Sequence, residues 1–320
     1  MGDVRSGLKR RARLLGEALR PPKSLTARGP AAPDGDQTPA AKTPAAEAPA
    51  AKAPAAADPG VKAKRPPKKT LSYDYGVPIA SRQVGSPVFV ISPVRSGSTL
   101  LRMILNSHSR IRAPHELHLR TVEVQLAEEF SAKSMLELDL DRHELEHVLW
   151  DRILHLELER SGKDVIVDKT PGNVWAWERL SYAWPHAKFI FLMRHPEGIV
   201  GSLARRKNNT ATRDKLEANV LKYLEPLEKA RTTLDGHSIR YEDLTSEPEE
   251  TLRKLCAYLD VEWEPDMLDY GEHDHGSLGA NLGDRSANIR SGRIQAAREE
   301  ETSDELSPEL AKYAATWGYA

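Results

Sequence analysis

The sequence predicts an α/β fold in which a central parallel β-sheet is flanked by helices. The first observation behind this prediction is that four short apolar runs alternate with stretches of helix-like sequence. The second is a Ser/Gly-rich turn that separates the first apolar run from a stretch with helical spacing. Strands that alternate with helices are joined by right-handed crossovers, so they become parallel and are covered on both faces. Ligands of such a sheet bind at the carboxyl ends of its strands.

The expected strands are the apolar runs themselves, at residues 87–91, 164–167, 188–192 and 237–241. The expected helices are stretches in which apolar residues recur at helical spacing: 99–105, 143–160, 174–184 and a segment that begins at Pro248. We therefore expect functional residues in the loops that directly follow the strands.

The globular domain is expected at residues 77–320. Residues 21–76 are predicted to be a disordered linker, because proline recurs every five residues between Pro39 and Pro59 and few branched or aromatic side chains offset the entropy of ordering. Residues 1–20 have the pattern of a basic amphipathic segment. Two interpretations of this segment stay open: a solubilising tail, or weak docking to an anionic membrane surface or a partner.

Composition and charge exclude several classes of protein. Hydrophobic residues make up 39% of the 320 residues, which is enough for a sizeable core. The single cysteine, Cys256, excludes an intrachain disulfide and a CxxC pair and favours a reducing, cytoplasmic location, peripheral at a membrane if residues 1–20 dock there. The sequence predicts neither a membrane span nor a signal peptide. Residues 1–70 carry a surplus of nine positive charges, so the remainder is acidic and unlike a nucleic-acid binder.

The loop after the first strand, Ser92–Thr99, has the composition of an anion-binding turn. Gly97 lets backbone N–H groups turn toward an anion, the following helix N-terminus adds its dipole, and Arg95 supplies a fork of donors. Against the G-x-x-x-x-G-K-[ST] template, Gly97 and Thr99 agree, but serines stand at the positions of the first glycine and the lysine. The loop suits a nucleotide phosphate, and the missing lysine makes a P-loop kinase or NTPase the weaker alternative.

Three motifs, in order along residues 86–320, resemble those of sulfotransferases that use 3′-phosphoadenosine 5′-phosphosulfate (PAPS). Pro93–Leu101 resembles the 5′-phosphosulfate loop, especially the Arg-Ser-Gly-[ST]-Thr form of bacterial and tyrosylprotein enzymes. Phe191–Ser202 is similar to the 3′-phosphate signature, and Ile239–Leu244 resembles the Tyr-Glu-Asp-Leu stretch that borders the adenine. The resemblance implies a P-loop NTPase-like topology and a set of PAPS-binding residues: Arg95, Ser96, Gly97, Ser98, Thr99, Arg194, Ser202, Tyr241 and, in a loop that closes over the cofactor, Arg293.

The resemblance also implies catalytic roles for Arg95, Lys169 and Glu116. Lys169 stands in a segment similar to the family's Asp-Lys-Thr-Pro stretch, whose lysine approaches the bridging oxygen and the sulfuryl group. Glu116 stands where tyrosylprotein and bacterial relatives carry a glutamate base, with His115 or His118 as the rival base. The sequence His-Glu-Leu-His spaces its histidines three apart rather than four, so no zinc site is expected and no metal is required.

The implied function is transfer of the sulfuryl group from PAPS to a hydroxyl, with an amine as the weaker alternative, by in-line displacement that leaves adenosine 3′,5′-bisphosphate. The acceptor is unidentified and could be a small molecule, a carbohydrate or a lipid; its contacts are expected in residues 115–160, 206–233 and 271–287. A second alternative is a non-catalytic nucleotide-binding module. The aromatic residues that follow Lys169 are expected mainly in the core, and Cys256 is expected to be a buried structural thiol.

Overall fold

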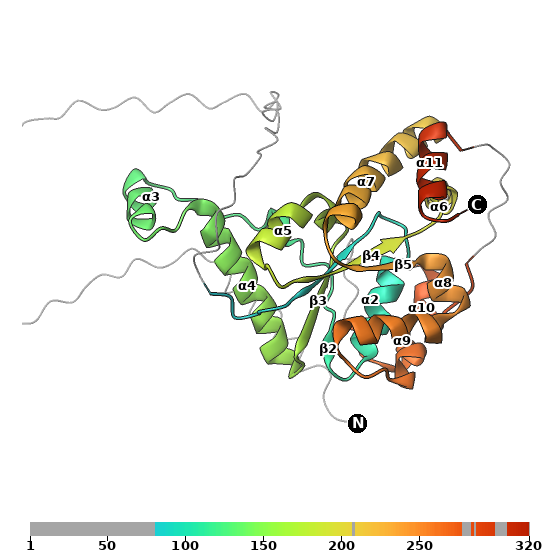
Figure 1. Cartoon of the computed structure of the whole chain (residues 1–320), viewed down its shortest axis with the longest axis horizontal. Coiled ribbons are helices and arrows are strands. Elements are labelled where there is room, and N and C mark those ends of the chain that lie inside the picture. The colour runs from blue at the N-terminus through green and yellow to red at the C-terminus, as the bar shows by residue number, and fades with distance from the viewer. Residues whose placement is uncertain (1–80, 207–208, 277–282, 285, 298–305, 320) are drawn as a thin grey trace, which may run out of the picture. The chain divides into compact units, whose positions relative to one another are not determined.

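The computed structural model describes residues 81–206, 209–276, 283–284, 286–297 and 306–319. The predictions for residues 1–20 and 21–76 lie outside these residues and stay predictions. Within the described part, the predicted α/β fold is confirmed: a parallel five-stranded sheet lies between two layers of helices (Figure 1). No helix in this part of the chain is long and apolar enough to cross a membrane.

The sheet has the strand order β2-β3-β1-β4-β5. Its strands are β1 (Val88–Ile91), β2 (Ile111–Arg112), β3 (Val165–Lys169), β4 (Lys188–Met193) and β5 (His237–Arg240). Every neighbouring pair is parallel, with Val90 of β1 opposite Lys169 on one side and Ile190 on the other. From β1 the chain crosses to the edge strand β2, returns to β3 beside β1, and then passes to the other side of β1 for β4 and β5. The connections therefore change direction at β1, and a crevice opens at its carboxyl end, where ligands of such sheets bind.

The helices join the strands in crossovers and continue beyond β5. They are α2 (Ser98–Ser107), α3 (Glu129–Leu136), α4 (Arg142–Ser161), α5 (Trp177–Ala183), α6 (Pro196–Ala204), α7 (Arg213–Thr233), α8 (Tyr241–Ser246), α9 (Pro248–Leu259), α10 (Ala287–Arg290) and α11 (Pro308–Thr316). Three short 3₁₀ helices are η1 (Leu119–Thr121), η2 (Pro171–Trp175) and η3 (Pro265–Glu272).

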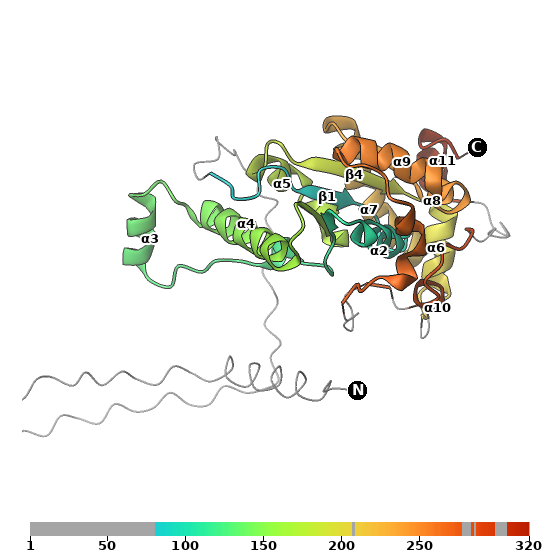
Figure 2. The same ribbon diagram turned by 90° about the horizontal axis from the view of Figure 1, so that it is seen from below.

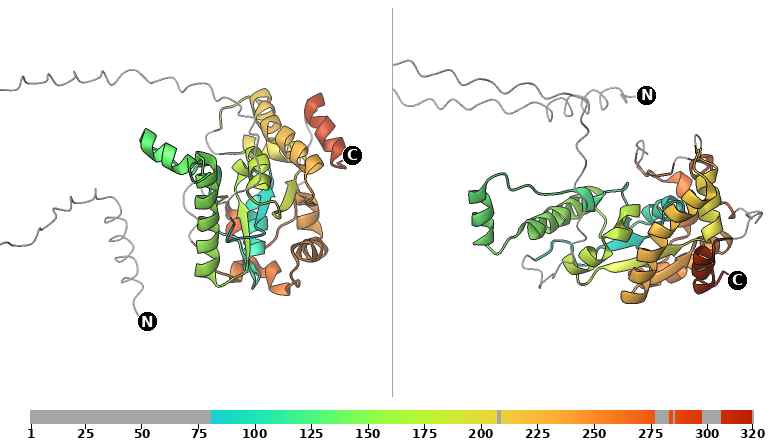
Figure 3. Two further views of the ribbon diagram at one scale, coloured as in Figure 1. Left: turned by 60° about the vertical axis from the view of Figure 1, so that its left-hand side comes forward. Right: turned by 90° about the horizontal axis from the view of Figure 1, so that it is seen from above.

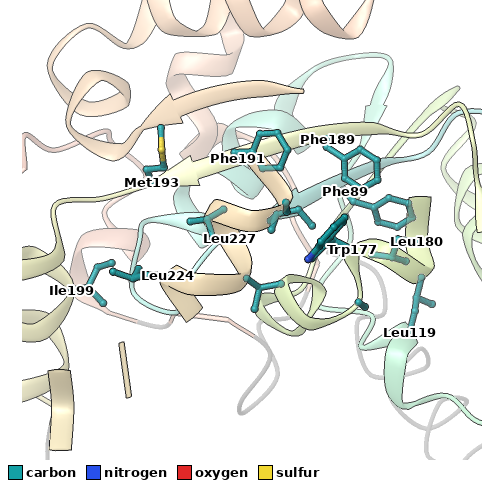
Figure 4. Close-up of a cluster of buried hydrophobic side chains, with 14 of the residues drawn as sticks. Phe89, Leu119, Trp177, Leu180, Phe189, Phe191, Met193, Ile199, Leu224 and Leu227 are labelled. Atoms are coloured by element: carbon teal, nitrogen blue, oxygen red, sulfur yellow. The ribbon is translucent and has the colours of Figure 1, made fainter. Parts of the chain in front are cut away.

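Two hydrophobic clusters pack on opposite faces of the sheet because alternate strand residues point to opposite sides. Phe89, Phe189 and Phe191 face the cluster formed with α4, α5, α6, α7 and α11 (Figure 4). Val90 and Ile190 face the cluster formed with α2, α8, α9 and η3. The two layers can be followed in Figures 1 and 3. With both faces covered, the sheet leaves its strand ends as the place for polar chemistry.

Helix α4 shows how local sequence sets a boundary and how a polar cluster is buried. Its N-cap Asp141 accepts a hydrogen bond from the backbone of Glu144 at 2.8 Å, and Gly162 ends the helix in a left-handed conformation with φ of 67°. Buried His147 accepts a hydrogen bond at Nε2 from Arg179 at 2.8 Å, and its Nδ1 lies 3.3 Å from Glu144. Burial, together with the charge of Arg179, lowers the pKa of His147 to about 4.

Helix α3 lies beyond one end of α4, away from the sheet (Figures 1 and 2). None of its residues is buried, and Phe130 is 80% exposed. Helix α3 therefore contributes nothing to either hydrophobic cluster.

The structure corrects three boundaries expected from sequence and adds one strand. Strand β3 continues through Lys169, which therefore ends a strand rather than following one. Residues 174–184 form the end of η2 and then α5 rather than one helix, because Ala176 leaves helical geometry. Tyr241 opens helix α8 instead of ending a strand. Strand β2 was missed because it has only two residues, too few for a periodic pattern.

Candidate functional site

A cavity of about 900 Å³ lies where the strands end, in the crevice expected from the topology. Residues after four strands line it: Arg95 and Gly97 after β1, Glu116 after β2, Arg194 after β4 and Tyr241 after β5. The remaining strand, β3, ends in Lys169, which contacts Glu116 but does not itself line the cavity. A polar or small residue at or directly after the end of each of the five strands thus lies at this cavity or in contact with a residue that lines it.

The loop after β1 forms an anion-binding turn at the start of α2. Arg95 and Gly97 both have left-handed backbones, with φ of 66° and 83°, and this geometry turns successive N–H groups toward the same side. Gly97 is required for a second reason, since a Cβ atom there would collide with the ring of Tyr241. Ser98 and Thr99 line the cavity at the helix N-terminus, whereas Ser96 is buried and donates to the carbonyl of Pro93 at 2.7 Å. Ser96 therefore stabilises the turn.

Arg95 connects the loop after β1 to the loop after β4. Its Nε donates to Ser202 Oγ at 3.1 Å, and its carbonyl accepts a hydrogen bond from Arg194 Nη1 at 2.9 Å. Residues from two distant parts of the sequence are thus in direct contact. A carboxylate that sequence reasoning missed, Asp284, lies 3.3 Å from Arg95 Nη1 and donates its backbone N–H to Thr99 Oγ1 at 3.0 Å. Its only sequence signal was its position in the segment 271–287.

Arg194 lies against the ring of Tyr241, with its guanidinium carbon 4.6 Å from the ring centre. Gly198 makes room for this side chain, since a Cβ atom there would lie 2.8 Å from Arg194 Nε. The loop is fixed by Glu242, which accepts from the backbone of His195 at 3.0 Å and from Tyr319 Oη at 2.6 Å. Arg194 and Tyr241 therefore present one flat, positively charged wall to the cavity.

Two further arginines after α6, Arg205 and Arg206, line the same cavity. Sequence reasoning assigned neither to the cofactor, and it expected Arg206 only as the first residue of the acceptor segment 206–233. Arg293 also lines the cavity and is exposed. The wall that carries these arginines suits a ligand with several negative charges.

Lys169 and Glu116 form a buried ion pair, with Nζ and Oε1 2.5 Å apart and side chains only 1% and 9% exposed. Burial lowers the pKa of Lys169, and the charge of Glu116 opposes this effect. Glu116 is the member of the pair that lines the cavity. A carboxylate at the cavity wall, backed by an ammonium group, can accept a proton from a bound hydroxyl.

A second buried cation, Arg102 on α2, was not predicted from sequence. It is 2% exposed, and its Nη1 donates to the carbonyl of Ala113 at 3.1 Å. Burial lowers its pKa to about 10, and the nearby charge of Glu116 acts in the opposite direction. The charge of Arg102 also acts on Lys169, whose pKa it helps to lower. Glu116 is thus the carboxylate that compensates two buried cations.

The two rival histidines differ in position. His118 Nε2 lies 3.3 Å from Glu116 Oε2. His115 is exposed and turns its Nδ1 to the backbone carbonyl of Glu116, at 3.1 Å. Neither histidine lines the cavity, so Glu116 is better placed than either to meet a ligand there.

The rest of the cavity wall includes Pro171, Asn219 and Tyr223, the last two on α7. Trp175 packs on Tyr223 with ring centres 4.5 Å apart, and it remains 45% exposed. Trp177 and Trp184 are buried in the core, as expected for most of this aromatic group.

Cys256 is also buried. Burial raises the pKa of its thiol to about 11, so the reactive thiolate form is disfavoured. It is a structural thiol, as predicted.

No cluster of three or more histidine, cysteine, aspartate or glutamate side chains in the described part of the chain has the arrangement of a metal site. The arrangement that is present can bind anionic groups at one end through backbone N–H groups and arginines. Near the centre it offers a carboxylate that can move a proton.

Comparisons with known proteins agree with this arrangement. The family model described as "Sulfotransferase family" matches residues 87–265, more than half of the chain. Protein-tyrosine sulfotransferase 1 of Danio rerio is 27% identical over 205 residues, which cover 58% of this chain and 56% of that protein. The chain thus spans about half the length of the curated relatives it matches.

Two solved structures share the fold. The sulfotransferase domain from the curacin biosynthetic pathway superposes with a TM-score of 0.55 at 24% identity, over 75% of this chain and 99% of that chain. The sulfotransferase domain from the Synechococcus PCC 7002 olefin synthase gives a TM-score of 0.53 at 22% identity, over 79% and 99% of the two chains.

Proposed function

Because the chain belongs to the sulfotransferase family, we propose that it transfers the sulfuryl group of PAPS to a hydroxyl group of an acceptor. The observation that carries this proposal is the contact of Arg95 with both Arg194 and Ser202 at the wall of one cavity. A nucleotide with phosphates at both the 5′ and 3′ positions needs two anion sites side by side, and these residues supply them.

The kinds of residue that line the cavity support PAPS as the donor. Backbone N–H groups of residues 97–99, with Arg95, are suited to the 5′-phosphosulfate because they combine a helix N-terminus with a left-handed turn. Arg194, Ser202 and Arg206 are suited to the 3′-phosphate. The ring of Tyr241, stacked on Arg194, offers a flat face for the adenine.

In the proposed mechanism, Lys169 and Arg95 stabilise negative charge that develops during transfer, and Glu116 takes the proton of the acceptor hydroxyl. When bound, PAPS supplies a sulfuryl group joined to a good leaving group, adenosine 3′,5′-bisphosphate. The acceptor oxygen forms its bond to sulfur as the bond from sulfur to the bridging oxygen breaks. Lys169 lies 2.5 Å from Glu116 and does not line the cavity, so it reaches the transferred group only when its Nζ moves away from Glu116. The same movement frees Glu116 to act as the base.

The acceptor is proposed to enter beside Tyr223 and Asn219, residues of α7 that line the cavity. The exposed ring of Trp175, packed on Tyr223, extends this wall with an apolar surface. A hydroxyl attached to a flat ring, as in a phenol or a sugar, suits these two rings. Several relatives are named as protein-tyrosine sulfotransferases, and the tyrosine side chain is a phenol of this kind.

We further propose a cytoplasmic location, on the basis of the single buried Cys256. Docking of residues 1–20 to an anionic membrane surface is the peripheral alternative. Cell fractionation of the full chain and of a variant lacking residues 1–20 tests both: a membrane fraction that is lost in the variant supports docking, and secretion overturns the cytoplasmic proposal.

Isothermal titration calorimetry tests the cofactor. Adenosine 3′,5′-bisphosphate is expected to bind with micromolar affinity, whereas ADP and ATP with Mg²⁺ bind much more weakly. Arg194→Ala should abolish this binding, and Arg152→Ala, a surface change on α4, should leave it intact. A preference for ATP with Mg²⁺ would instead favour the P-loop kinase.

Transfer itself is tested with ³⁵S-labelled PAPS and a panel of phenols, sugars and tyrosine peptides. Labelled product that disappears in Glu116→Gln supports the proposed chemistry. Tight binding of the bisphosphate without transfer of label to any acceptor or to water would favour the non-catalytic nucleotide-binding module.

A further inference from the structure

The two oxygens of Glu116 have different neighbours. Oε1 is held by Lys169 at 2.5 Å, and Oε2 faces His118 Nε2 at 3.3 Å. The side chain of Glu116 is 9% exposed, whereas that of His118 is 44% exposed. A nearly buried carboxylate is therefore in contact with one side chain that reaches solvent.

His118 is fixed in an unusual backbone conformation. Its φ of 52° and ψ of 36° lie in the left-handed region, which is strained for a residue that has a Cβ atom. The surroundings hold this geometry: the His118 N–H donates to Thr170 Oγ1 at 3.2 Å, and its carbonyl accepts from the backbone of Thr121 at 2.9 Å. Thr170 is itself fixed by a hydrogen bond to buried Asp168 at 2.9 Å. Strain maintained by this many contacts is a feature typical of functional sites.

The same segment of chain that carries Lys169 thus also positions His118. Lys169 ends β3, and Thr170 follows it directly. One contacts Oε1 of Glu116 and the other orients the residue that faces Oε2. A change in the end of β3 would therefore alter both neighbours of the carboxylate.

We propose that His118 carries the proton that Glu116 takes from the acceptor out to solvent, and so restores the base for the next turnover. This inference depends on the proposed function. His118 does not line the cavity, so the route stays open while nucleotide and acceptor fill it. The oxygen of Glu116 that faces His118 is not the one that Lys169 holds, so the proposed proton path is separate from the buried ion pair.

The proton balance is complete within these groups. The acceptor oxygen forms its bond to sulfur, and its proton moves to Glu116 Oε2, which becomes a carboxylic acid. The proton then passes to Nε2 of neutral His118, whose other proton is on Nδ1. The resulting imidazolium loses its Nδ1 proton to a water or buffer base. Proton exchange with solvent at the exposed ring then removes the proton from Nε2 and returns one to Nδ1, which restores the starting tautomer before the next turnover. One proton is released to solvent for each sulfuryl group transferred.

The first test compares His118→Gln with the matched control His115→Gln. Glutamine can still hydrogen-bond Glu116 but cannot carry a proton, so we expect kcat to fall about tenfold in dilute buffer, less than the 10²–10⁴ that general bases contribute. The KM for PAPS and the Kd for adenosine 3′,5′-bisphosphate should not change. Turnover is measured with ³⁵S-PAPS and the acceptor panel, and with water as acceptor through release of labelled sulfate. His115→Gln should match the unmodified protein.

Imidazole rescue separates a proton carrier from a merely structural residue. Added imidazole should restore the kcat of His118→Gln and of His118→Asn, a variant that tolerates the left-handed backbone. It should not restore Glu116→Gln. Unchanged kcat in His118→Gln, or a loss that imidazole leaves in place, would overturn the relay while the proposed function stands. Absence of any turnover in the unmodified protein would overturn both.

A readout without turnover uses ¹⁵N-histidine NMR of the full chain without nucleotide. The His118 signals are assigned by their loss in His118→Gln. Glu116→Gln should shift the Nε2 resonance of His118, because the charge beside that atom changes, while the His115 signals move little. No shift at His118 would contradict the contact on which the relay depends.

Discussion

The buried pair of Lys169 and Glu116 leads to a prediction about stability. Removing one partner of a buried ion pair leaves an uncompensated charge and costs about 3–5 kcal/mol, whereas replacing both by apolar residues is often neutral. The side chains are 1% and 9% exposed, so water can compensate little of the loss. We therefore expect Lys169→Met and Glu116→Leu each to lower the free energy of unfolding by about 3–5 kcal/mol.

The two single variants should not be equivalent. In Lys169→Met, Arg102 still lies near the carboxylate, so the loss is expected to be about 3 kcal/mol. In Glu116→Leu, Arg102 loses the nearby carboxylate and Lys169 keeps only the weaker effect of buried Asp168, so the loss is expected to be about 5 kcal/mol.

Urea unfolding of the two single variants and the double variant measures the coupling. The double variant should lose about 3 kcal/mol, less than Glu116→Leu alone, because Lys169 is no longer left unpaired, whereas buried Arg102 still lacks the carboxylate of Glu116. None of the three should transfer sulfate, and all should retain binding of adenosine 3′,5′-bisphosphate, which lacks the sulfuryl group. If the two losses simply add in the double variant, the pair does not provide the mutual compensation inferred from its geometry.

Three further predictions follow from the site and the core. The folded state holds His147 at a pKa of about 4 against an ordinary 6.5, so between these values the unfolded chain binds the extra proton and stability falls as the pH falls; the loss reaches about 3 kcal/mol. Urea unfolding at about pH 7 and about pH 4.5, which span most of this pH range, measures the loss of stability. An equal pH dependence of stability in His147→Gln would show that His147 is not the source of the loss. Gly97→Ala should weaken binding of adenosine 3′,5′-bisphosphate in calorimetry at least about tenfold, because its Cβ displaces Tyr241 as well as straining the backbone by about 1–2 kcal/mol. Gly162→Ala, which has a similar φ of 67° but no neighbour within 4 Å, is the matched control and should retain binding. Trp175→Ala should raise the KM for ring-bearing acceptors in the ³⁵S assay without changing nucleotide affinity, whereas Phe130→Ala, also on the surface but on α3, should do neither. A changed nucleotide affinity in Trp175→Ala would place this ring on the donor side.

The fold could be predicted from sequence because its strands are continuous apolar runs. Residues 88–91 and 188–193 are buried almost throughout, as expected for a parallel sheet covered on both faces, so period and composition agree. Strand β2 could not be predicted, because two residues carry no periodicity and Arg112 is polar. The long helix α7 was expected only as part of a specificity segment, since its apolar residues are interrupted by charges and by Pro226.

The candidate site could be predicted where a motif is local, and less well where partners come from distant segments. The loop around Gly97 and the neighbours of Arg194 follow from short patterns, and the structure brings them together at one cavity. Asp284 and Arg102 were missed because nothing local marks them. Asp284 meets Arg95 across the fold, and Arg102 resembles any polar residue on a helix until its burial is known. The catalytic roles of Glu116 and Lys169 stay predictions, which the transfer assays test.

Because the residues of the site come from the ends of all five strands, they are spread along most of the domain's sequence, and this affects when the site can form during synthesis. In order of synthesis the contributors run from Arg95 through Glu116, Lys169 and Arg194 to Tyr241, with Arg293 last. No early fragment of the chain contains both of the proposed anion sites, so under the proposed function tight nucleotide binding begins only after most of the domain has left the ribosome. Nucleotide at about one hundred times its Kd would then raise the free energy of unfolding by about 2.7 kcal/mol. The ligand would therefore stabilise the domain only at a late stage of folding.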